Sequence, residues 1–308
     1  MGTGTWRDRL GRDRAPGALW RVVAFAVLFL AILQLQVVLL PGIEPLYADD
    51  RLTIALLVQG LMLLVAALAA GAILLRWADA RPMRELGFAP AGGVPRELGA
   101  GLLIGAGCLV AVVVPLALTG AFHFYAEPGT AAGWAGVVVT SMLWLAVPAA
   151  AEEALFRGYA FRALVDGMGP VAALLVTSAL FAAVHGANPN VDPIGLLNIF
   201  FAGLLLGYGV LRTGSLWLAT GVHLGWNWAI AGLLDLPVSG LDPFDPPLYD
   251  LEPGAPAWLS GGAFGPEGGV AAALAIALGL VLTWKLTGSG RALAAPDGQG
   301  DGADDADR

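Results

Sequence analysis

Charge, cysteine and histidine are all scarce in this chain. Only 13% of its 308 residues are charged and 57% are hydrophobic, whereas roughly a quarter of the residues of a soluble domain are charged. Cys108 is the only cysteine, which excludes an intrachain disulfide and a site built from several thiolates. There is no GxGxxG loop and no basic stripe beyond the arginines that flank apolar runs, so neither a nucleotide nor a nucleic acid is expected as a partner. The composition predicts an integral membrane protein surrounded by a lipid bilayer.

Long apolar runs are abundant instead. A run of about 17 to 25 apolar residues can cross a bilayer as a helix, and the chain has eight candidates. They cover residues 20–40, 53–75, 98–119, 134–165, 170–186, 194–211, 215–234 and 268–286. The 43 glycines favour close helix contacts, as in membrane bundles. The predicted fold class is therefore all-α, a polytopic transmembrane helix bundle with about eight spans.

The basic residues predict how the chain is oriented. Lys and Arg concentrate in cytoplasmic loops, and placing both termini in the cytoplasm puts fifteen of the sixteen basic residues inside, leaving only Arg51 outside. The predicted order is a basic N-terminus (1–19), N-terminal spans (20–133), a helical core (134–234), an acidic extracytoplasmic loop (235–267), a last span (268–286) and a disordered acidic tail (287–308). The Ala- and Gly-rich, Lys-poor composition suggests a bacterial cell membrane.

Three polar motifs interrupt the apolar core. They read Glu152-Glu153-x-x-x-Arg157, Phe181-x-x-x-His185 and His223-x-x-x-Asn227. An ionisable residue inside a span is costly and marks a functional site by default. If helices meet the cytoplasmic surface near residues 166–170 and 215, a rise of about 1.5 Å per residue puts the four polar residues of the proposed site roughly 12 to 22 Å from that surface. We therefore expect Glu152, His185, His223 and Asn227 to converge near the middle of the bilayer.

The two neighbouring glutamates are expected to have different roles. Glu153 and Arg157 lie four positions apart, which suits a structural ion pair on one helix face. Glu152 points about 100° away from Glu153, and a carboxylate without an ion-pair partner is suited to take a proton from water. His185 could hold the same water. His223 and Asn227 would donate hydrogen bonds to a carbonyl oxygen that gains negative charge.

The three motifs resemble those of the CPBP family of intramembrane endopeptidases. This Abi-like family covers type II CAAX prenyl proteases and bacteriocin-processing or immunity proteins, and its pattern is EExxxR, FxxxH and HxxxN. The resemblance spans roughly residues 134–234. It implies an endopeptidase that cuts a membrane-associated peptide or protein, such as a CAAX-type tail or a bacteriocin-like precursor. Glu152, His185, His223 and Asn227 are the implied catalytic residues.

Two questions stay open at this point. Glu152, His185 and His223 could together bind zinc or another divalent metal with one open position, or Glu152 could activate water alone. The same scaffold could also serve as a non-catalytic immunity or scaffold protein that binds a peptide. A transporter with a Glu–His proton relay is a third possibility, but the chain shows no inverted repeat.

Overall fold

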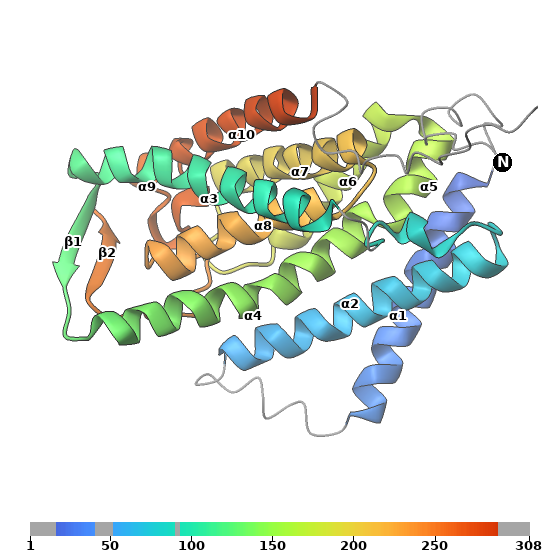
Figure 1. Cartoon of the computed structure of the whole chain (residues 1–308), viewed down its shortest axis with the longest axis horizontal. Helices are drawn as coiled ribbons and strands as arrows, with labels where there is room; N and C mark the ends of the chain where they lie inside the picture. The colour runs from blue at the N-terminus through green and yellow to red at the C-terminus, as the bar shows by residue number, and fades with distance from the viewer. Residues whose placement is uncertain (1–16, 41–51, 90–92, 289–308) are drawn as a thin grey trace, which may run out of the picture.

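The structure, a computed structural model, describes residues 17–40, 52–89 and 93–288. Most of the predicted basic N-terminus, Arg51 and the predicted acidic tail from residue 289 onward lie outside the described residues. The main helices form a bundle (Figure 1). Their bounds are α1 Ala18–Leu39, α2 Leu52–Trp77, α3 Val94–Leu118, α4 Ala131–Arg157, α5 Tyr159–Met168, α6 Pro170–His185, α7 Pro193–Thr213, α8 Trp217–Trp228, α9 Ala257–Ser260 and α10 Val270–Gly288.

The predicted all-α bundle is confirmed. Six helical segments of the described chain are long and apolar enough to cross a membrane, and each of the eight predicted spans contains a helix. Two of the predicted spans, 170–186 and 215–234, contain shorter helices. These are α6 with 16 residues and α8 with 12 residues. A π-helical turn over Ala229–Leu233 extends α8. A short 3-10 helix, Met83–Leu86, joins α2 to α3 on the side of α5.

The predicted span 134–165 is not one helix. It breaks at Gly158 into α4 and α5. A Cβ atom on residue 158 would lie 2.3 Å from the Ala154 carbonyl oxygen, so only glycine allows the chain to turn this tightly. The helix α5 then packs on α1, where Arg21 hydrogen-bonds the Tyr159 hydroxyl and forms an ion pair with Asp166.

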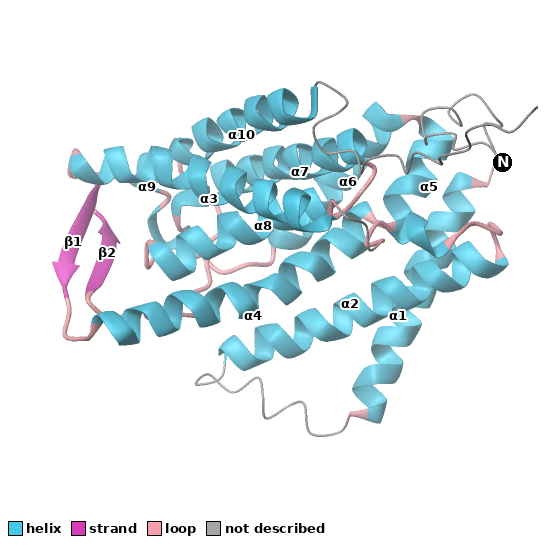
Figure 2. Cartoon of the chain, viewed as in Figure 1, coloured by secondary structure: helices cyan, strands magenta, loops and turns pink. Residues whose placement is uncertain are grey.

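A small β-sheet, which the sequence analysis did not predict, lies at one end of the bundle. Strands β1 (Phe122–Ala126) and β2 (Tyr249–Pro253) pair antiparallel, with His123 opposite Glu252. Figure 2 shows these strands at the end of the bundle opposite α5. Their pairing joins the connection that precedes α4 to the long connection that precedes α10.

Glycines bring α3 and α8 into backbone contact. Gly101 and Gly105 on α3 face Gly221 and Gly225 on α8, and a Cβ at any of the four would lie between 2.1 and 2.3 Å from a backbone oxygen of the other helix. This is the close approach that a small-xxx-small spacing permits in membrane bundles. It fixes the position of α8, which carries His223 between two of these glycines.

Candidate active site

The four predicted catalytic residues line one cavity. It has a volume of about 370 Å³ and is lined by residues of α2, α4, α6, α7, α8 and α10 and of the connections near β2. Glu152, His185, His223 and Asn227 all lie on its wall. The structure thus brings together side chains from three helices that are separated by up to 75 residues in the sequence.

Glu152 lies between the two histidines. Its Oε2 atom is 3.9 Å from Nε2 of His185 and 3.7 Å from Nε2 of His223. Within the described residues this oxygen has no hydrogen-bond partner in the protein. These separations slightly exceed a direct hydrogen bond, and a water molecule beside the three atoms is within reach of all of them.

Glu153 faces the opposite way and is fully buried. Its Oε1 atom lies 3.1 Å from Nη1 of Arg157, so the two residues form an ion pair on α4. The same oxygen lies 2.9 Å from Nδ1 of His223. The sequence analysis assigned Glu153 only to the ion pair and missed this contact, which links α4 to α8. Glu153 therefore also orients a residue of the cavity.

The hydrogen bonds of the two histidines define which ring nitrogen carries a proton. Nδ1 of His185 lies 2.8 Å from the Phe181 carbonyl oxygen, and an oxygen of this kind can only accept. Nδ1 of His223 faces Glu153, which is also an acceptor while it is ionised beside Arg157. Both histidines therefore donate through Nδ1 and turn Nε2 toward Glu152.

Phe181 links the buried arginine to both histidines. The guanidinium carbon of Arg157 lies 4.2 Å from the centre of the Phe181 ring, a distance typical of a cation–π contact. The ring centres of His185 and His223 lie 4.6 and 6.0 Å from that of Phe181. Phe181 therefore packs between the ion pair and the cavity.

A second buried carboxylate, Glu267, borders the cavity from the connection before α10. It accepts hydrogen bonds from the Trp226 indole and from the backbone and hydroxyl of Ser239. Asn198 on α7 donates to the backbone oxygens of Glu267 and Gly269. Sequence reasoning missed Glu267 because no motif surrounds it. Together these contacts fasten the long connection onto α7 and α8, beside Asn227.

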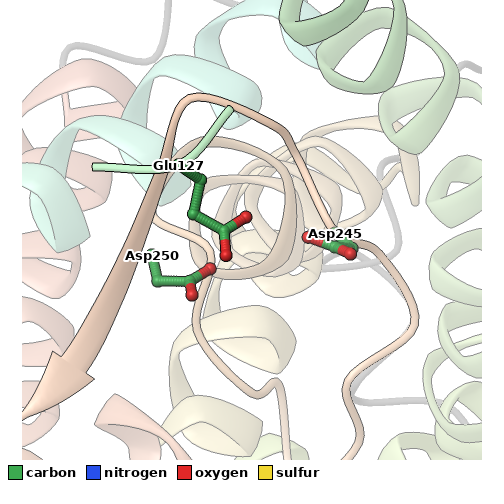
Figure 3. Close-up of side chains that lie close together, drawn as sticks. All are labelled: Glu127, Asp245 and Asp250. Carbon is green, nitrogen blue, oxygen red and sulfur yellow. The ribbon is translucent and has the colours of Figure 1, made fainter. Parts of the chain in front are cut away.

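Metal binding by Glu152, His185 and His223 stays a prediction, and the separations of these residues can be compared with those in a zinc site. Zinc bonds of about 2.0–2.1 Å place tetrahedral ligand atoms about 3.3 Å apart, and the Glu–His distances are 3.7 and 3.9 Å. Among the described residues, only Glu127, Asp245 and Asp250 place three such donor atoms within 4.8 Å of one another. Figure 3 shows this acidic group, in which Asp250 belongs to β2 and Glu127 directly follows β1. Those carboxylates are largely exposed and do not line the cavity.

Comparison with known proteins agrees with the motifs. Residues 134–229 match the family described as Type II CAAX prenyl endopeptidase Rce1-like. The matched segment is a CPBP-family domain. It begins in α4, ends at the start of the π-helical turn and contains all the polar residues of the three motifs. No curated protein matches the chain. The apolar helices and the Rce1-like segment indicate an integral, multi-pass membrane protein.

Proposed function

We propose that this protein is an intramembrane endopeptidase in which Glu152 and His185 activate the attacking water. The observation that supports this most directly is the position of Glu152. A carboxylate oxygen without a protein hydrogen-bond partner faces two histidine nitrogens on the wall of one cavity, within an Rce1-like segment. A binding protein has no need for such an arrangement, whereas general-base catalysis requires it.

In the proposed reaction, a water molecule beside Glu152 attacks the carbonyl carbon of the scissile peptide bond. Glu152 accepts a proton from that water, and His185 holds the water through Nε2. The carbonyl oxygen becomes negatively charged in the tetrahedral intermediate. When the C–N bond breaks, Glu152 returns the proton to the leaving nitrogen, so that the products are a carboxyl group and an amine.

His223 and Asn227 stabilise the negative oxygen in this proposal. They lie one helical turn apart on α8 and share the cavity wall. Because Nδ1–H of His223 already bonds Glu153, His223 donates to the oxygen through Nε2 only when both ring nitrogens carry protons. Nδ1 of His223 faces Glu153 and Nε2 faces Glu152, so the ring with two protons has an acceptor near each nitrogen.

The substrate is a membrane-associated peptide or protein. A CAAX-type tail and a bacteriocin-like precursor are both compatible with a cavity whose lining is mostly apolar. We further propose that the protein resides in a bacterial cell membrane with both termini in the cytoplasm. Metal assistance stays an open part of the proposal, since the catalytic steps above use only residues of the chain.

The test is cleavage of a peptide library by purified protein in nanodiscs, for the wild type and Glu152→Gln, with and without a chelator. We expect the variant to lose about 10²- to 10⁴-fold in rate, the usual contribution of a general base, while its melting temperature stays close to that of the wild type. Cleavage that persists under chelation supports water activation by glutamate, and its loss supports a metal. Equal activity of a folded Glu152→Gln protein contradicts the proposal, and a folded but inactive wild type favours the peptide-binding alternative.

A further inference from the structure

The two ends of the bundle carry opposite charge. At the end marked by α5 and the 3-10 helix, most helix termini and connections of the described chain bring a basic residue. These residues are Arg76, Arg81, Arg84, Arg96, Arg162, Arg212 and Lys285. At the opposite end, marked by β1 and β2, the connections 119–130, 186–192 and 234–269 contain no Lys or Arg. Short loops rich in Lys and Arg stay in the cytoplasm, so the end with β1 and β2 is the extracytoplasmic one.

The cavity belongs to the extracytoplasmic end. His185 is the last residue of α6, and Asn188 in the connection that follows lines the cavity. Ser239 and Glu267 line it from the long connection around β2. On α2, the lining residues fall in the first half of the helix, which begins at this end. None of the lining residues comes from residues 78–89, 158–169 or 214–216, which lie at the basic end.

Residues near the basic end are closely packed, since Arg157, Tyr159, Phe161 and Leu216 are at most 2% exposed. A second hollow at the basic end, lined by Arg81, Arg84 and Arg162, shares no lining residue with the cavity. In the described chain these two hollows are therefore separate, and neither one joins the cavity to the basic end.

We infer that substrate enters the cavity of Glu152 from the extracytoplasmic side. This inference rests on the proposed function and defines its substrate class: an apolar peptide segment that is exported or exposed on the outer face of the membrane. A prenylated tail on a cytoplasmic protein is then on the wrong side of the bilayer. The apolar majority of the lining residues suits a segment drawn from the outer leaflet.

The side of access is tested by cysteine labelling of the full-length chain. Cys108 is buried and is first replaced by Ala, which leaves a chain without cysteine. Ala187→Cys places a thiol on the exposed connection next to Asn188, and Met83→Cys places one at the basic end. With a membrane-impermeant maleimide, we expect Ala187→Cys to be labelled at least tenfold more in right-side-out than in inside-out sealed vesicles, and Met83→Cys to show the reverse. The opposite pattern, or equal labelling of both sites in both preparations, overturns the inference.

A cleavage assay on the same vesicles separates the inference from the proposed function. The probe is a library of quenched-fluorescence peptides with a sulfonated dye that cannot cross the bilayer. We expect cleavage in right-side-out vesicles, at least tenfold less in sealed inside-out vesicles, recovery after detergent, and none with Glu152→Gln. Cleavage confined to inside-out vesicles overturns the inference but leaves the peptidase in place. If no cleavage is seen even in detergent, the proposed peptidase function is contradicted, and the substrate class is contradicted with it. The labelling experiment still decides which side of the membrane the cavity faces.

Discussion

Nδ1 of His223 lies 2.9 Å from the carboxylate of Glu153, a residue 70 positions earlier in the chain. This contact makes one oxygen of Glu153 the partner of both Arg157 and a residue of the cavity wall. Glu153 thus connects the buried ion pair to the candidate active site.

Replacing Glu153 with Gln should destabilise the protein more than Glu152→Gln does. The change leaves the guanidinium of Arg157 buried without its charged partner, and breaking a buried pair in this way costs about 3–5 kcal/mol. Thermal unfolding in detergent measures the difference. The double variant Glu153→Gln, Arg157→Leu removes both charges and should recover part of the loss. If the double variant loses more stability than the two single variants lose when added together, a direct pairing of the two residues is contradicted.

The two nitrogens of His223 can be separated by substitution. Asn at position 223 keeps a donor near the position of Nδ1, and Gln keeps one near the position of Nε2. We expect His223→Asn to fold with near-normal stability and to lose about 10²- to 10³-fold in cleavage rate, as removal of an oxyanion donor does. We expect His223→Gln to be less stable but more active than His223→Asn. Melting temperature and cleavage rate of both variants test this, and the reverse ranking in activity would rule out Nε2 as the oxyanion donor.

The glycine contact between α3 and α8 should control activity from outside the cavity. A Cβ on residue 105 would lie 2.1 Å from the Val222 carbonyl oxygen, immediately before His223. We expect Gly105→Ala to push α8 away, at a cost of about 1–3 kcal/mol for overpacking, and to lower the cleavage rate. Gly107→Ala on the same helix is the matched control, since nothing lies within 4 Å of its Cβ. Equal effects of the two variants would refute the argument.

The protein should lose stability as pH rises because of a half-buried carboxyl group, Asp235, in the connection that leads to β2. Burial, followed by the hydrogen bond and charge of Asp250 and the charges of Asp242 and Asp245, raises the pKa of Asp235 to about 8. The folded chain therefore binds a proton that the unfolded chain releases at an ordinary carboxyl pKa of about 4. The stabilisation is complete below that value and is lost as pH rises through about 8.

Asp235→Asn is the variant that tests this titration, because Asn tolerates the positive φ of 52° at this position. Its melting temperature should fall less than that of the wild type between pH 5 and pH 9. Glu252→Gln on β2, which removes an exposed carboxylate, should leave the wild-type pH dependence unchanged. Parallel pH profiles of all three proteins would show that Asp235 does not titrate as described.

Much of the site geometry follows from the sequence. Helical rise alone places Glu152, His185, His223 and Asn227 at similar depths, and the structure finds all four on one cavity wall. Their catalytic roles remain predictions. The rotation of each helix about its axis is not encoded in such spacing, so the bond from Glu153 to His223 could not be foreseen.

Other features depend on contacts between distant segments. The break at Gly158 carries no signal in a chain with 43 glycines, because its cause is the packing of α5 on α1. In the sequence, Glu267 is one of several acidic residues of a predicted loop. Its role is recognised only from the hydrogen bonds that Trp226 and Ser239 donate to it in the structure. In each case the deciding partner lies more than 25 residues away in the sequence.

The contact of α3 with α8 also bears on what the smallest working unit of this protein is. The segment that matches the family begins at residue 134, yet α3 ends at Leu118 and holds the helix of His223 through its backbone. A fragment or chimera cut at the family boundary would carry every motif residue and still lack the surface that positions one of them. The unit to transplant into another membrane protein therefore starts no later than Val94.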